Sequence, residues 1–179
     1  MLFRSPWIAG LPAGRLPVAF GLGASQPFRC WPAERFAALI DQLDTLRPIA
    51  PVLVVGPGEK ALALAVAGRV RTRIHFLPSL DLGGTAAILE RCAIFLGNDS
   101  GPAHLAAAAG IPVVMISAHA LGVPETHPGN PDKCRPFGRL VRVVRPPSPA
   151  GDGISGVTVE VVVAAALELG FSPGPEAIG

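Results

Sequence analysis

The sequence of 179 residues has little charge, and the charge that it has is spread out. Only 16% of the residues are charged, the formal net charge is +2, and the 15 lysines and arginines are dispersed along the chain. A nucleic-acid-binding surface needs concentrated basic residues, so we do not expect a nucleic-acid partner. A few basic residues are still enough to meet a phosphate group in a pocket.

Cysteines are few and scattered. Cys30, Cys92 and Cys134 lie far apart, and no C-x-x-C pair is present. This pattern is typical neither of a disulfide framework nor of a zinc site. It fits a reducing compartment, where cysteines serve as small apolar residues, so we expect a cytoplasmic protein. No cluster of metal ligands is visible in the sequence, which favours a site that works without a metal or another cofactor.

The sequence also lacks an apolar run long enough to span a membrane. Its longest apolar stretch, residues 105–123, is interrupted by Gly110-Ile111-Pro112 and by His119, whereas a membrane helix needs about 20 apolar residues. Prolines and glycines also break the N-terminal segment before it can form the apolar region of a signal peptide. We therefore expect a soluble protein with a tail or linker at residues 1–16.

What the sequence does contain is an alternation of short apolar runs and helical patterns. Strands are expected at 17–22, 51–55, 73–77, 93–96, 112–117 and 140–144, and helices at 32–46, 59–70, 84–92, 100–109 and 158–169. Such alternation predicts right-handed crossovers and a parallel sheet covered by helices. The expected fold is α/β, a Rossmann-like doubly wound parallel sheet of about six strands over residues 17–170, with a frayed tail at 171–179.

One candidate site is the loop Gly97-Asn98-Asp99-Ser100-Gly101-Pro102-Ala103-His104, between an apolar strand and an alanine-rich helix. The free N–H groups and the dipole of a helix N-terminus attract phosphate. Ser100 can add a hydroxyl, Gly101 permits close approach, and His104 can reach back as a donor. Asp99 is better placed to accept from a sugar hydroxyl. The alternative interpretation is plain N-capping, for which Asp or Ser before a helix is common.

The second candidate is the segment of residues 21–32, which directly follows the first strand and contains Gly21, Gly23, Ser25 and Arg29. Glycines, a hydroxyl and an arginine before a helix form a plausible diphosphate clamp. Trp31, in the same segment, is more often a core residue than a ligand platform. If the strand order is 3-2-1-4-5-6, strands 1 and 4 are neighbours, and both loops face the crevice at the carboxyl ends of the strands where ligands bind in such folds.

Three segments together resemble glycosyltransferase family 9, the heptosyltransferases that use ADP-heptose in lipopolysaccharide core assembly. They are the loop 97–112, the segment Gly23-Ala24-Ser25 with Arg29-Cys30-Trp31-Pro32, and the strand end Val54-Val55-Gly56-Pro57-Gly58-Glu59. The resemblance covers residues 17–169. It implies the C-terminal, Rossmann-like half of a two-domain GT-B fold, which holds the nucleotide sugar.

The resemblance also implies roles for individual residues. Ser25 and Arg29 would contact the diphosphate, Glu59 the ribose and Asp99 the sugar. Three further residues would line the phosphate end of the site: Ser100, Gly101 and His104. Adenine would lie against backbone at residues 77–80. The usual lysine of the family is Arg29 here, which keeps the charge but changes its geometry.

In the family, an N-terminal domain binds the acceptor and carries the proposed carboxylate base. Only a short tail precedes the first expected strand here. We therefore expect a nucleotide-sugar-binding domain, with an ADP-sugar favoured, that serves glycosyl transfer in lipopolysaccharide or related glycan synthesis. A separate acceptor-binding domain or chain would complete the activity. The alternatives are a non-catalytic nucleotide-sugar-binding module or remnant, and another phosphate-binding Rossmann protein such as a dehydrogenase. The last would need a G-x-G-x-x-G fingerprint, which the first loop lacks.

The remaining histidines and arginines have mostly structural interpretations. His75 lies within an expected strand and His127 among prolines, whereas His119 follows the fifth strand and, with Asp99, is a candidate for acid–base chemistry. The residues 139, 142 and 145 are arginines that alternate along the last strand. Solvation of this basic face is the default, and the alternative is a peripheral contact with an anionic lipid surface at the inner face of the inner membrane.

Overall fold

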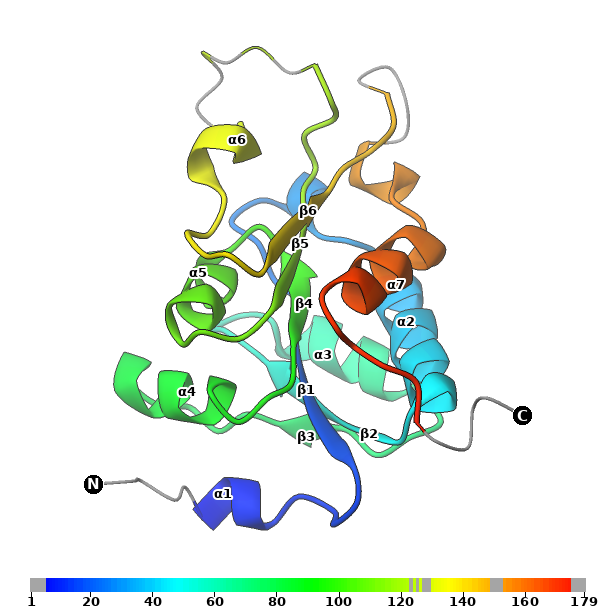
Figure 1. The fold of residues 1–179 in the computed structure, drawn as a ribbon, viewed down its shortest axis with the longest axis vertical. Helices are drawn as coiled ribbons and strands as arrows, with labels where there is room; N and C mark the ends of the chain where they lie inside the picture. The colour runs from blue at the N-terminus through cyan, green and yellow to red at the C-terminus, as the bar shows by residue number, and fades with distance from the viewer. Residues whose placement is uncertain (1–5, 123, 125, 127–129, 149–152, 175–179) are drawn as a thin grey trace.

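A computed structural model describes residues 6–122, 124, 126, 130–148 and 153–174 (Figure 1). Its strands are β1 (Leu16–Gly21), β2 (Ile49–Val54), β3 (His75–Phe76), β4 (Phe95–Asn98), β5 (Val113–Ile116) and β6 (Val141–Val144). Its α-helices are α1 (Pro6–Ala9), α2 (Ala33–Leu46), α3 (Lys60–Ala67), α4 (Leu82–Leu89), α5 (Gly101–Ala108), α6 (Pro131–Cys134) and α7 (Val159–Glu168), and two 3-10 turns are η1 (Pro27–Arg29) and η2 (Gly153–Gly156).

The strands form one sheet in the order β3-β2-β1-β4-β5-β6, and each pair of neighbours is parallel. This arrangement confirms the expected α/β, doubly wound fold and the strand order on which the shared crevice depended. Because strands β1 and β4 are neighbours, the chain reverses its direction of winding between them. Ligands of open parallel sheets bind in the crevice outside the carboxyl ends of the strands at such a point.

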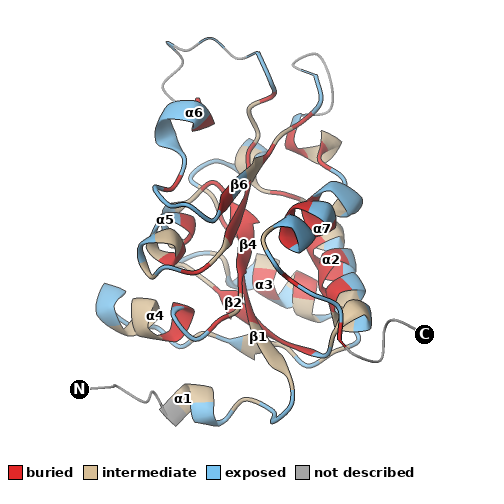
Figure 2. Ribbon diagram, viewed as in Figure 1, coloured by how far each residue is buried: buried red, intermediate tan, exposed pale blue. Residues whose placement is uncertain are grey.

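Helices cover both faces of the sheet, because the side chains of each strand alternate between the two faces. Val18 and Phe20 of β1 belong to one buried cluster, with residues of α2, α3 and α7, whereas Ala19 belongs to the other, with residues of α4 and α5. Figure 1 shows α2 and α7 on one side of the sheet and α4 and α5 on the other, and Figure 2 shows that the strands between them are buried.

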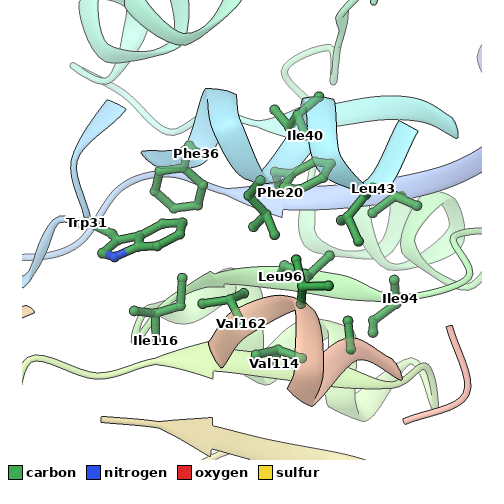
Figure 3. Packing of buried hydrophobic residues seen from close by; sticks show 14 of the residues in the cluster. Phe20, Trp31, Phe36, Ile40, Leu43, Ile94, Leu96, Val114, Ile116 and Val162 are labelled. Carbon is green, nitrogen blue, oxygen red and sulfur yellow. The ribbon is translucent and has the colours of Figure 1, made fainter. Parts of the chain in front are cut away.

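Helix α2 illustrates how the sequence specifies these layers. Pro32 occupies its N-cap position, the helix ends at Leu46 just before Pro48, and its apolar residues recur on one stripe. The buried members of that stripe are Phe36, Ala37, Leu39, Ile40 and Leu43. They pack against the sheet beside Phe20, Leu96 and Val162 (Figure 3). The first helix of the fold is thereby fixed over β1, and so is the loop that precedes it.

Two glycines allow the carboxyl ends of β1 and β4 to lie close together. Gly21 and Gly97 are partners in register. A Cβ atom added at Gly97 would lie 2.5 to 2.9 Å from backbone atoms of Gly21, and one added at Gly21 would lie 2.4 Å from the ring of Phe95. The contact at Gly97 is with backbone atoms, so glycine is required there, whereas a side chain at position 21 would force the ring of Phe95 to move. The loops that follow the two strands therefore start side by side.

The ends of the chain are more ordered than expected over the residues that the structure describes. Part of the expected N-terminal tail or linker forms α1, and Trp7 and Leu11 pack against the sheet. At the other end, Phe171 is buried and Gly174 N–H donates to the carbonyl of Leu46. These apolar contacts and the backbone hydrogen bond order the two segments. The many glycines and prolines in both segments had instead indicated a lack of regular structure. No helix in the described part of the chain is long and apolar enough to cross a membrane.

Candidate functional site

A cavity of about 260 Å³ opens at the carboxyl ends of β1, β2 and β4. The loop after β1 contributes Gly23, Ala24 and Ser25, the loop after β2 contributes Gly56 and Glu59, and the start of α5 contributes Ser100, Gly101 and Pro102. These three loops are far apart in the sequence. The sheet order brings them together at the edge of the sheet where ligands of such folds usually bind.

Arg29 joins two of the predicted site residues. Its Nη1 donates to the hydroxyl of Ser25 over 3.2 Å, and its Nη2 forms an ion pair with Oδ2 of Asp99. The side chains of Arg29 and Asp99 are 20% and 8% exposed, so the pair is largely desolvated. Within the described residues, the buried Nε of Arg29 has no hydrogen-bond partner. A buried guanidinium N–H without a partner is costly, and an anion next to it would satisfy that donor.

Asn98 connects the two loops of the candidate site. Its side chain is fully buried; Oδ1 accepts from the backbone N–H of Trp31 over 3.1 Å, and Nδ2 donates to the carbonyl of Leu22 over 2.5 Å. Both partners flank the segment that carries Ser25 and Arg29. Sequence analysis placed Asn98 in the candidate loop but assigned it no role. Hydrogen bonds between distant loops become evident only once the strand order is known.

The start of α5 keeps backbone donors available. Ser100 is the N-cap residue, but its side chain makes no capping bond; its hydroxyl donates instead to the carbonyl of Asn98 over 3.2 Å. The N–H groups of Ser100 and Gly101 have no partner among the described residues. A Cβ atom at Gly101 would meet nothing within 4 Å, so the space beside it is open. The structure therefore does not use the Ser100 hydroxyl for plain N-capping.

Glu59 reaches from the start of α3 across to the loop after β1. Its Oε2 accepts from the backbone N–H of Gly56 over 2.8 Å. A Cβ atom added at Gly23 would lie 1.6 Å from Glu59 Oε1, so the carboxylate occupies the space that glycine leaves. From the sequence, Gly23 was interpreted as part of a glycine-containing diphosphate clamp. The structure shows that it also makes room for an acid in the cavity wall.

Other predicted residues lie outside this cavity. His104 is exposed one turn further along α5, and the half-buried His119 follows β5, where its backbone N–H donates to Ser117 Oγ. Trp31 is a core residue, as expected from the sequence. It is fully buried, its ring contacts that of Phe36 edge to face, and its Nε1–H donates to the carbonyl of Val157. His127 lies outside the described residues.

His75 lies on the edge strand β3, away from the cavity lining. Burial, with Arg73 and Arg15 nearby, lowers the pKa of its imidazole. The neutral form is therefore favoured. The position within a strand agrees with a structural role, but Nε2 of His75 is buried without a hydrogen-bond partner among the described residues, so the expectation of a satisfied side chain is not met. Within the described residues, no group of three or more His, Cys, Asp or Glu side chains is arranged to hold a metal ion.

The cavity is lined by one carboxylate, that of Glu59, and by Ser100 and Gly101, whose backbone N–H groups have no partner among the described residues. The ion pair of Arg29 and Asp99 lies next to this lining, because Arg29 contacts Ser25 and Asp99 directly precedes Ser100. The cation and the amides suit a phosphate or diphosphate. Carboxylates at the margin suit hydroxyl groups, which donate hydrogen bonds to them. The arrangement can bind an anionic ligand that also carries hydroxyl groups, and it can stabilise negative charge that develops on a leaving phosphate.

Comparisons with known proteins agree with this assignment of the fold. The model of the family glycosyltransferase family 9 (heptosyltransferase) matches residues 4–123. Lipopolysaccharide heptosyltransferase 3 of Escherichia coli is 32% identical over 99 residues, which is 52% of this chain and 28% of that protein. The chain thus spans well under half the length of this curated relative.

Solved structures extend the similarity over nearly the whole chain. A glycosyl transferase family 9 protein from Veillonella parvula matches with a TM-score of 0.76 and 26% identity, over 90% of this chain and 48% of that one. The E. coli heptosyltransferase WaaC with ADP matches with a TM-score of 0.71 and 25% identity, over 91% of this chain and 47% of that one. In each case the match takes up about half of the solved chain.

Proposed function

We propose that this chain, which belongs to glycosyltransferase family 9, binds the diphosphate of a nucleotide sugar at the carboxyl ends of β1 and β4. The observation that carries the proposal is the pairing of a desolvated arginine, Arg29, whose Nε has no partner among the described residues, with the open N-terminus of α5. Ser25, Ser100 and Gly101 complete the phosphate contacts, and His104 lies one turn further along the helix as a donor.

An ADP-sugar is the favoured ligand, because the matched structures include a heptosyltransferase with ADP and because the site supplies acceptors for hydroxyl groups. Glu59 would accept from the ribose and Asp99 from the sugar. Asp99 is already paired with Arg29 through Oδ2, which leaves Oδ1 for a sugar hydroxyl. In this arrangement one ion pair connects the phosphate contacts to the sugar contacts.

The role in glycosyl transfer follows from where charge develops. As the bond between the sugar and the nucleotide diphosphate breaks, the negative charge of the leaving diphosphate increases. Arg29 and the amides of Ser100 and Gly101 would stabilise that charge from fixed positions. We propose that the chain does this in lipopolysaccharide or related glycan synthesis, because its curated relative is a lipopolysaccharide heptosyltransferase.

Glu59→Ala tests the ribose contact. We expect it to weaken ADP binding roughly tenfold, since a hydrogen bond to a charged acceptor is lost. Binding of 2′,3′-dideoxy-ADP, which lacks the ribose hydroxyls, should change little. Titration of both nucleotides into wild-type protein and variant measures the difference. Equal losses for the two nucleotides would place Glu59 away from the ribose.

The acceptor is proposed to be held by a separate domain or chain. The matched family structures are about twice as long as the region to which this chain corresponds, and a transfer needs an acceptor hydroxyl in line with the anomeric carbon and a base for its proton. The 179-residue chain is therefore expected to bind the nucleotide sugar without appreciable transfer, and an acceptor-binding partner should restore transfer. Radiolabelled sugar incorporation into lipopolysaccharide acceptor measures this.

Robust turnover by the isolated chain would contradict that expectation and would call for an internal base, for which Asp99 and His119 are the first candidates. The second candidate function, a binding module that never catalyses transfer, gives a different result. Such a module would bind ADP, yet no acceptor-binding domain would restore transfer. The ion pair of Asp99 with Arg29 makes Asp99 a poor internal base, which agrees with the expectation that the isolated chain does not catalyse transfer in either case.

A further inference from the structure

Three cations without acidic partners lie in the segment from α6 to β6. Lys133, Arg135 and Arg139 are exposed, and none forms an ion pair with another described residue. Their neighbours differ, because Arg142 pairs with Glu168 over 3.0 Å and Arg145 with Asp132 over 2.5 Å. Among the arginines at positions 139, 142 and 145, Arg139 is therefore the one without a carboxylate partner in the described part of the chain. It lies close in sequence to Lys133 of α6 and to Arg135, which directly follows α6.

An exposed aromatic residue lies among these cations. Phe137 is 99% exposed, and Leu140, the next apolar residue, is 47% exposed. Lys133, Arg135, Phe137 and Arg139 line one hollow of about 540 Å³, together with Asp132, whose carboxylate is paired with Arg145. Figure 2 shows that α6 is mostly exposed at the margin of the molecule. Burial of a fully exposed aromatic side chain lowers the free energy of the system.

We propose that this basic loop surface, formed by Lys133, Arg135, Phe137, Arg139 and Leu140, docks on an anionic lipid bilayer. The cations would approach the phosphate groups of the lipids, and Phe137 would enter the interfacial layer, where aromatic side chains are favoured. A soluble anion would satisfy the cations but would leave Phe137 in water. A bilayer offers both charge complementarity and an apolar layer, which is why it fits this surface better.

The surface is connected to the candidate site through α5. A Cβ atom at Gly138, in the middle of the surface, would lie 3.7 Å from Cβ of Ala107 near the C-terminal end of α5, and Figure 1 shows the segment between α6 and β6 next to that helix. Gly101 begins the same helix in the cavity wall, roughly 9 Å away along the helix axis at 1.5 Å per residue. Docking would therefore hold the cavity close to the membrane surface. The proposal does not depend on nucleotide binding.

Vesicle sedimentation of the 179-residue chain tests this inference. We expect binding to vesicles of phosphatidylcholine mixed with phosphatidylglycerol, weakening as salt is raised, and little binding to phosphatidylcholine alone. Each cation near an anionic leaflet contributes roughly fivefold to the partition coefficient. The triple variant Lys133→Gln, Arg135→Gln, Arg139→Gln should thus lose about 100-fold, and Phe137→Ser roughly tenfold.

The matched control is Arg69→Gln, Arg73→Gln, Arg91→Gln, which removes the same charge from exposed positions near the opposite edge of the sheet. It should retain most of the binding, because its residues lie away from the basic loop surface. Equal losses in the two triple variants would show only an effect of net charge and would overturn the proposal. So would a wild-type chain that binds neither kind of vesicle, or one that binds soluble pyrophosphate at Arg135 and Arg139 but no vesicle.

Discussion

Replacing Arg29 by alanine should weaken ADP binding by roughly 10- to 100-fold while adenosine binding changes little. Arg29 is the cation of the candidate phosphate site, with Nη1 on Ser25 and Nη2 on Asp99. A hydrogen bond to a charged group contributes about 1.5–3 kcal/mol, which corresponds to that range of affinity. Calorimetric titration of ADP and adenosine into the same variant separates the phosphate contribution from that of the nucleoside.

Arg29→Lys is the control for this experiment. It keeps the positive charge but replaces the planar fork with a single ammonium group, so we expect a smaller loss of ADP affinity than with alanine. It also keeps a cation near Asp99, whose largely buried carboxylate would otherwise lose its partner. Equal losses for ADP and adenosine in Arg29→Ala would show that the arginine does not contact the phosphates.

The second large effect is expected at Asn98. Asn98→Ala removes the acceptor for Trp31 N–H and the donor for Leu22 C=O, both in buried surroundings. Each backbone group left without a partner costs about 1–3 kcal/mol, so the free energy of unfolding should fall by about 2–4 kcal/mol. Urea unfolding followed by tryptophan fluorescence measures this loss, because Trp31 lies in the core.

Ser100→Ala is the matched variant for Asn98. Ser100 is only partly buried, and its hydroxyl donates to the carbonyl of Asn98 within the same loop. Its removal should change the free energy of unfolding by no more than about 0.5 kcal/mol, although it removes a proposed phosphate contact. If Asn98→Ala were as stable as Ser100→Ala, the buried amide would not be what holds the two loops together.

The sequence was sufficient to predict the sheet and the positions of the loops that form the candidate site. Buried parallel strands are continuous apolar runs, so β1, β2, β4 and β5 were recognised from composition alone. The strand β3 is shorter than expected, with only His75 and Phe76 paired, because an edge strand is defined by its one neighbour and not by its own hydrophobicity. The short helix α6 begins at Pro131 and involves too few residues to give a periodic pattern.

The individual contacts of the site were less accessible from the sequence. The pairing of Arg29 with Asp99 joins residues 70 positions apart, and spacing alone gives no information on such a contact. The same holds for Glu59, whose carboxylate fills the space above Gly23. Both depend on the order of strands, which determines which loops meet. The roles of Ser25, Arg29, Glu59, Asp99, Ser100, Gly101 and His104 in binding stay predictions.

Calorimetric titration of the wild-type chain with ADP, UDP and GDP tests the central claim most directly. The nucleotide diphosphate is expected to bind at the carboxyl ends of β1 and β4, where Arg29 and the start of α5 converge. We predict saturable binding of ADP with a stoichiometry of one, and weaker binding of UDP and GDP. The absence of a heat signal with all three nucleotides at millimolar concentration would contradict the account.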